Sequence, residues 1–242
     1  MGSVSTTRFT ASTLTAELQH LRRLHDERAA SPQLAAALDA VADFQARRLD
    51  ATYQDLAREP RYEEAIAFFR SDLYGPGDFS RRDADLARIV PTMQRVLPSG
   101  AVAAVTMAIQ LSALSQELDR ALLAKLGVSP LTVPNYCVAY RACANRADRE
   151  RQIALIGTVG RGLDHYVRAR LVRHALAVMR MPARAAGLGS LQGFLERGVA
   201  GFARMRGATE FLNIIDARER ALMNAIFAGD DAPFRDPRGS TP

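Results

Sequence analysis

Residues 68–88 read FFRSDLYGPGDFSRRDADLAR, an aromatic helix end followed by a glycine–proline turn and a charged helix start. Gly75 stands where a helix-ending residue takes a left-handed conformation, and Pro76 stops the helix from continuing. We therefore expect a positive φ at Gly75. Ser80 is the expected N-cap of the next helix, because its hydroxyl can accept a first-turn N–H. The stretch predicts a corner between two helices.

The same corner is rich in charged side chains. Asp83 and Asp85 fall in the first turn of the second helix, where the helix dipole favours negative charge. Phe69 and Leu73 are expected to be core residues that pack the corner onto its neighbours. Cap and turn chemistry accounts for these residues, but a polar network at this corner is also a candidate site.

Beyond the corner, three segments resemble the FFLEELY-motif proteins, an uncharacterised bacterial family. The resemblance extends over residues 35–228. It implies an all-helical protein, and it transfers no catalytic residues because the family carries no assigned reaction. The resembling segments are Phe68–Tyr74, Ala147–Ile153 and Phe194–Gly198. The first departs from the signature at Arg70, Ser71 and Asp72.

Apolar residues recur at helical spacings along most of the chain, and no alternating strand pattern appears. We predict an all-α fold, a single compact multi-helix bundle of about eight to ten helices, over residues 12–228. One long helix is expected from Asp148 to about Met181. Residues 1–11 are expected to be disordered, and residues 229–242 to form a loose tail.

Composition favours a soluble cytoplasmic protein. The first residues are polar, without the apolar stretch of a signal peptide, and two cysteines do not make a disulfide framework. The most apolar run, Ala101–Ala113, is too short to span a bilayer, so no integral membrane segment is predicted. Self-association is compatible with the sequence.

No metal or cofactor site is predicted. Glu17 and His20 have the Glu-x-x-His spacing of di-iron bundles, but such a site needs that motif twice. Gly157–Gly162 lacks the spacing and the preceding strand of a dinucleotide-binding turn. Glycines within a helical pattern favour close helix packing instead.

One helix carries polar residues on an otherwise apolar surface. Gln110 and Glu117 are seven residues apart, hence on one helix face, and a buried carboxylate needs a partner. We expect Glu117 to be mostly buried and to contact an arginine or a tyrosine. The candidate polar core site is Asp72, Tyr74, Arg82, Asp83, Arg88, Glu117, Tyr140 and Arg141.

Basic residues are concentrated in the second half of the chain. Residues 141–206 contain 13 arginines and four acidic residues, within a chain of net charge +6. A basic face of this kind is either simply solvated or binds an acidic protein, nucleic acid or anionic lipid. The candidate anion-binding residues are Arg161, Arg168, Arg173, Arg180 and Arg184.

Two hypotheses for function follow. The first is a non-catalytic binding or interaction protein that uses a helical groove or the basic face. The second is an enzyme or small-ligand binder with a polar site near Glu117 and residues 72–88. The sequence shows neither a nucleophile–base pair nor a complete metal-ligand set, so it names no reaction.

Overall fold

The computed structural model describes residues 11–73, 79–96, 99–168 and 170–235. This part of the chain is all-α, without a strand, and its eleven α-helices slightly exceed the expected number. A π-helical turn, η1 (Phe69–Leu73), follows α4. The helices are α1 (Ala11–Ala30), α2 (Pro32–Thr52), α3 (Gln54–Ala57), α4 (Glu63–Phe68), α5 (Ser80–Val96), α6 (Ser99–Leu126), α7 (Val133–Ala142), α8 (Arg146–Val167), α9 (Arg170–Ala185), α10 (Gly189–Met205) and α11 (Thr209–Ala228).

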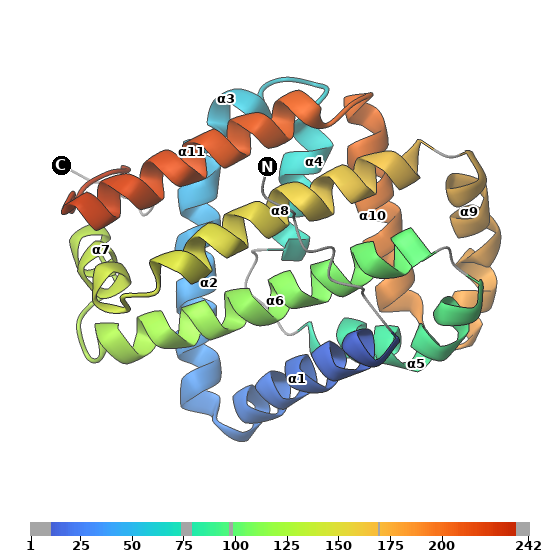
Figure 1. Cartoon of the computed structure of the whole chain (residues 1–242), viewed down its shortest axis with the longest axis horizontal. Coiled ribbons are helices and arrows are strands. Elements are labelled where there is room, and N and C mark those ends of the chain that lie inside the picture. The colour runs from blue at the N-terminus through green and yellow to red at the C-terminus, as the bar shows by residue number, and fades with distance from the viewer. Residues whose placement is uncertain (1–10, 74–78, 97–98, 169, 236–242) are drawn as a thin grey trace, which may run out of the picture.

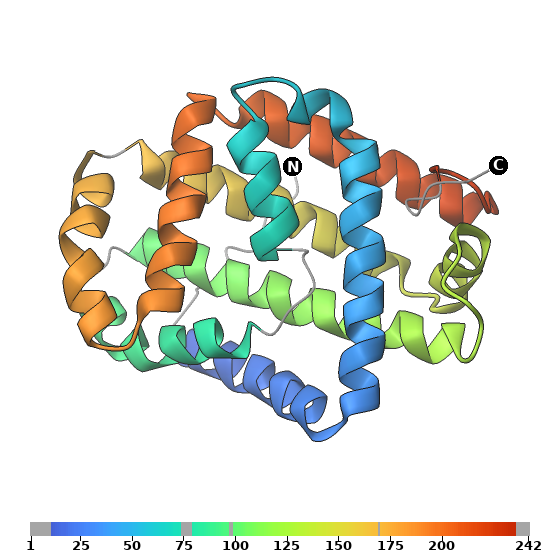
Figure 2. The same ribbon diagram turned by 180° about the vertical axis from the view of Figure 1, so that it is seen from behind.

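The helices form two layers that cross each other. Figure 1 shows α1, α6, α8 and α11 running side by side in one layer, with α8 between α6 and α11. Figure 2, from behind, shows α2, α4 and α10 crossing that layer. At one end of the molecule α9 lies beside α10, and α7 closes the other end.

The predicted long helix over residues 148–181 is wrong, because the chain forms two helices there. α8 ends at Val167 and α9 begins at Arg170. α8 packs against α6 and α11, whereas α9 packs against α10, so the chain has to change direction between them. Helical periodicity continues across the break, and for this reason the sequence pattern does not reveal it. Pro182 lies inside α9.

Three groups of buried apolar residues lie between the helices. The first joins α2, α6, α7, α8 and α11, and includes Phe44, Leu122 and Tyr136. The second joins α4, α8, α10 and α11 around Phe202 and Phe211. The third packs α1 against α5 and α6. Beyond the last helix, Phe234 packs edge-on against Phe44 and Tyr136.

The expected corner is described only in part. Gly75 lies outside the described residues, and so does the side chain of Leu73, so neither prediction is tested. α5 begins one residue earlier than expected, at Ser80, and the carbonyl of Phe79 accepts the backbone N–H of Asp83 at 3.0 Å. Phe69 is partly buried in the second apolar group.

Glycines set how closely neighbouring helices within each layer approach. A Cβ on Gly201 of α10 would lie 3.1 Å from the Cα of Ala65 in α4. A Cβ on Gly160 of α8 would lie 2.5 Å from Cδ2 of Leu212 in α11. Real Cβ atoms essentially never approach so closely as the second of these distances. Gly160 therefore has the helix-packing role expected for the glycines of residues 157–162.

α6 contains a segment, Gly100–Leu126, that is long and apolar enough to cross a membrane. The core helix of a soluble protein meets the same criteria. α6 packs against α1, α2, α7 and α8, and within this segment the exposed residues are Gly100, Glu117, Ala124 and Lys125. This arrangement is compatible with a soluble protein.

The glycine contacts give a matched pair of substitutions in α8. Gly160→Ala forces its methyl group against Leu212 and should lower stability by about 1–3 kcal/mol. Gly157→Ala meets only the mobile end of Arg161, and helix propensity should then raise stability by up to about 1 kcal/mol. Thermal unfolding of both variants tests this, and equal melting temperatures would contradict the proposed packing.

Candidate functional site

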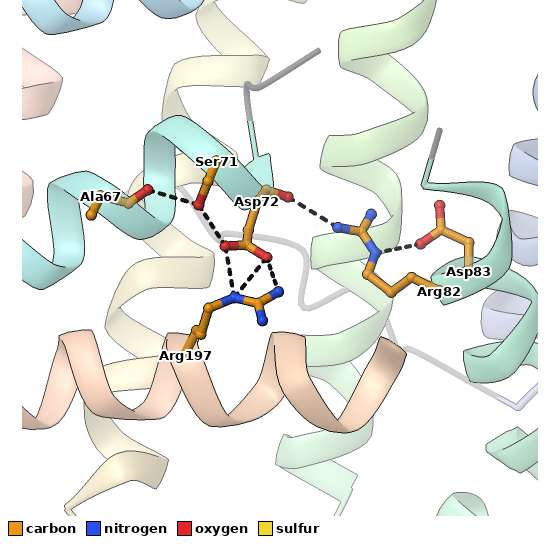
Figure 3. A network of polar contacts seen from close by, with 6 residues as sticks. All are labelled: Ala67, Ser71, Asp72, Arg82, Asp83 and Arg197. Carbon is orange, nitrogen blue, oxygen red and sulfur yellow. Dashed lines mark hydrogen bonds and ion pairs between the residues drawn. The ribbon is translucent and has the colours of Figure 1, made fainter. Parts of the chain in front are cut away.

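A buried carboxylate, Asp72, lies at the centre of the charged corner (Figure 3). Nε of Arg197, on α10, lies 3.1 and 3.0 Å from the two carboxylate oxygens of Asp72. Hydrogen bonding to Asp72 raises the pKa of Arg197. The Ser71 hydroxyl lies 2.7 Å from Asp72 Oδ2 and 2.9 Å from the Ala67 carbonyl, so its single proton serves one acceptor at a time.

Arg82 links the backbone of Asp72 to the start of α5. Its Nη1 donates to the backbone carbonyl of Asp72 at 3.0 Å, and its Nε donates to Asp83 Oδ1 at 2.9 Å. The guanidinium carbon also lies 4.6 Å from the ring centres of both Phe79 and Phe194. Stacking between two aromatic rings and two hydrogen bonds hold Arg82 in one position.

The network continues to α1 through a buried histidine. His25 Nε2 lies 2.9 Å from Asp83 Oδ2, and both side chains are about nine-tenths buried. His25 Nδ1 is buried and has no hydrogen-bond partner among the described residues. Asp83 therefore joins α1 and α5, and through Arg82 it joins both to η1 and α10.

The other predicted residues of the corner lie at its edge. Asp85 is buried, and its Oδ1 lies 3.5 Å from Nη1 of Arg88. Arg88 also donates to the carbonyl of Ala186, 3.2 Å away, just beyond α9. Arg88 thus ties α5 to the end of α9. Tyr74 lies outside the described residues.

The expectation that Glu117 is buried is wrong. Its side chain is 47% exposed, and Oε1 lies 3.0 Å from His20 Nε2 rather than beside an arginine or a tyrosine. Gln110, on the same face, donates to Glu17 Oε1 at 2.7 Å. Polar side chains of α1 cover this face of α6. The face therefore lies at a helix contact that is partly exposed to solvent. Helical spacing alone could not show which helix would cover it.

Tyr140 and Arg141 lie at the α7 end of the molecule. Tyr140 is buried, and burial raises the pKa of its hydroxyl. Arg141 Nη2 lies 2.5 Å from Asp231 Oδ1, and Nη1 donates to the carbonyl of Ile226 at 3.2 Å. Arg141 therefore satisfies a carbonyl in the last turn of α11. These residues form a second polar region, separate from Asp72.

An ion pair that the sequence analysis missed joins α2 to α11. Arg48 donates to both carboxylate oxygens of Glu219, at 2.8 and 3.0 Å, and the Tyr53 hydroxyl donates to Glu219 Oε1 at 2.7 Å. Burial is the largest single effect and would lower the pKa of Arg48, but the charge and hydrogen bonds of Glu219, with smaller effects of Tyr136 and Tyr53, together outweigh it and raise the pKa. A cavity of about 20 Å³ beside this pair has room for one water molecule.

Arg149 is the second missed residue. It is 4% exposed, its guanidinium lies 4.3 Å from the ring centre of Tyr140, and it donates to the carbonyl of Leu118 at 3.4 Å. Arg48 and Arg149 share a detectable signal, since each occupies an apolar-face position of its helix. Arg48 follows Phe44 by four residues, and Arg149 precedes Ile153 by four.

Folding neutralises part of the basic face predicted for residues 141–206. Among the described residues of this segment, six arginines form ion pairs, half of them with acids from outside the segment. They are Arg141, Arg146, Arg168, Arg180, Arg197 and Arg204. Among the described residues, Arg161 and Arg184 are exposed with no carboxylate at ion-pair distance. The side chain of Arg173 lies outside the described part.

In these networks, buried charged side chains pair with side chains of opposite charge. No group of three or more His, Cys, Asp or Glu side chains is placed to hold a metal in the part of the chain that the structure describes. Burial raises the pKa of Cys137 to about 12, so its thiol is not ionised near neutral pH. The only described hydrogen-bond partner of His25 is Asp83.

Asp72 should contribute more to stability than a surface carboxylate does. Asp72→Asn removes the charge that Arg197 pairs with and should lower stability by about 1–2 kcal/mol, since Arg197 is half exposed and its charge is partly screened. Asp216→Asn breaks an exposed pair with Arg220 and should change stability by no more than about 0.5 kcal/mol. Urea unfolding of both variants measures the difference, and equal losses would show that burial of Asp72 is energetically unimportant.

Comparison with known proteins identifies the family of this chain. No curated protein and no solved structure matches the chain. One family model, described as a domain of unknown function (DUF8198), matches residues 24–233. The match contains Asp72, Arg82, Asp83, Arg197, His25 and both missed arginines. The chain therefore belongs to the DUF8198 family, whose match covers every helix from the end of α1 to α11.

Proposed function

We propose that this protein is a non-catalytic binding protein and that its interaction surface is the exposed face of α9. The observation that carries the proposal is a set of large apolar side chains left in solvent there. Val178, Met179 and Met181 are 58%, 50% and 71% exposed. Exposed apolar side chains gathered on one helix are typical of interaction sites.

The charge of α9 adds to this argument. The helix reads RLVRHALAVMRMPARA and contains no acidic residue. Arg180 pairs with Glu196 of the neighbouring α10, whereas Arg184 is exposed beside the apolar residues. A surface of this composition favours a partner that presents carboxylates around an apolar centre.

An acidic, amphipathic protein segment fits α9 better than other polyanions. Nucleic acid offers phosphates but leaves the exposed methionines without an apolar partner. Helices that bind lipid surfaces usually insert aromatic or leucine side chains, whereas the large exposed apolar residues in the described part of α9 are valine and methionine. A second α9 would bring like charges together. Flexible methionines, in contrast, adapt to varied protein surfaces.

We also infer that the chain is one of the bacterial FFLEELY-motif proteins, that it folds as one domain and that it acts in the cytoplasm. The contacts between its resembling segments support the family inference. Phe68 lies 5.3 Å from Phe194, measured between ring centres, and Asp72 pairs with Arg197. Residues that form such mutual contacts are those that a family signature would retain.

A peptide-binding measurement tests the α9 surface. The probe is a fluorescent helical peptide of glutamate and leucine, with vesicles of phosphatidylserine and a mixed-sequence DNA duplex measured in parallel. We expect peptide binding that weakens as salt is raised. The double variant Val178→Ser, Met181→Ser should weaken it by about tenfold or more, since it removes apolar area at the contact.

The matched control is the pair Val128→Ser and Val138→Ser, whose side chains are also exposed but lie elsewhere on the surface. These variants should bind the peptide like the unaltered protein. If vesicles or DNA bind in preference to the peptide, the partner of α9 is a lipid surface or a nucleic acid and not an acidic protein. Absence of binding to all three probes at low salt would refute a general anion-binding role for α9.

A further inference from the structure

A cavity separate from α9's exposed face lies where the end of α8 meets the start of α11. Its volume is about 260 Å³, and it opens to solvent. Its lining combines positive charge with a small polar residue. The lining residues are Arg161, Asp164, His165, Arg168, Thr209 and Leu212.

Close helix packing one turn earlier positions the two sides of this cavity. Gly160 has no side chain, and Leu212 of α11 occupies the space where a Cβ would lie. α8 and α11 are therefore in direct contact at Gly160. Because this contact fixes the spacing of the two helices, the residues of the next turn of α8 face Thr209, the first residue of α11.

Arg168 is held in place at the cavity by a neighbouring carboxylate. Its Nη2 lies 2.6 Å from Asp164 Oδ2, one turn earlier on α8. The same nitrogen lies 3.4 Å from the position of a Cβ on Gly207, in the connection that leads into α11. Asp164 thus orients the guanidinium, and most of its five N–H donors remain for another acceptor.

An arginine and a histidine also line the same cavity. Arg161 donates to the Thr158 hydroxyl at 3.3 Å, and no carboxylate among the described residues lies at ion-pair distance from it. The imidazole of His165 is exposed at the cavity. With Asp164 as the single acid in the lining, positive charge is in excess.

The start of α11 adds backbone donors to this cluster. Ala208 occupies the N-cap position and has no side chain that could accept a hydrogen bond. The first N–H groups of a helix lack intrahelical partners, and the helix dipole makes this end attractive to an anion. An anion in the cavity would therefore meet arginine side chains from α8 and backbone donors from α11.

We propose that this cavity binds the phosphate group of a small phosphorylated molecule. Fork-shaped guanidinium groups and helix N-termini are both suited to phosphate oxygens. The volume lies below the ~300 Å³ at which drug-sized ligand sites begin, so a small phosphomonoester fits better than a nucleotide. The site does not depend on the α9 surface, because none of its lining residues belongs to α9.

Calorimetric titration with glycerol phosphate, and with glycerol as the uncharged parent, tests the proposal. The full-length protein should bind glycerol phosphate and not glycerol. Arg161→Gln and Arg168→Gln should each weaken binding by about tenfold or more, since each removes a charge-assisted contact. Arg151→Gln, an exposed arginine on α8 outside the cavity, should leave binding unchanged.

A second variant separates a lost site from a lost fold. Thr209→Glu places a carboxylate at the start of α11, where the helix dipole favours it, so the fold should be retained while phosphate is excluded. Retained glycerol phosphate binding in this variant, or no binding by the unaltered protein at about 10 mM ligand, would overturn the proposal. The acidic-peptide assay on the same variants measures binding at α9 independently. Failure of one site can therefore be distinguished from failure of the other.

Discussion

The close approach of α4 and α10 is the constraint on which the charged corner depends. Gly201 has no side chain, and the Cα of Ala65 in α4 lies only 3.1 Å from where its Cβ would be. Gly198, one turn earlier, makes room for the ring of Phe68. With the two helices this near, Arg197 reaches the buried carboxylate of Asp72. A Cβ at either glycine would lie in tight contact with α4, so α4 or Phe68 would have to shift by a few tenths of an ångström beside the pair of Arg197 and Asp72. Loss of that pair would be costly, because Asp72 is buried.

Buried charge also joins other pairs of helices. The pair of Arg48 and Glu219 joins α2 to α11, and Asp83 joins α5 to α1 through His25. Such groups add little net stability relative to apolar residues of the same volume, but the loss of one partner leaves the other uncompensated. Together they require particular helices to be adjacent, which general hydrophobic burial does not.

In the folded protein, several of the arginines that make the second half of the chain basic form ion pairs. Arginines of α10 and the end of α7 pair with acids from η1, α4 and the C-terminal segment, as Arg204 does with Glu64. Among the described residues, exposed arginines without an ion pair remain on several helices, and some of them lie at the end of the molecule where α9 packs beside α10. There α9 presents exposed apolar residues, and the junction of α8 and α11 encloses a cavity lined by Arg161 and Arg168. Both proposed functions therefore lie at the same end but on different helices.

The sequence by itself determined the all-α fold and the charged character of the corner at Asp72 and Asp83. These features are local, because helical periodicity, caps and turns depend on residues within a few positions of each other. Only the tertiary structure decided that Glu117 is exposed, that the chain turns after Val167 and that Arg197 pairs with Asp72. Each depends on which helix covers a given face, and a residue's own neighbours along the chain do not specify that contact.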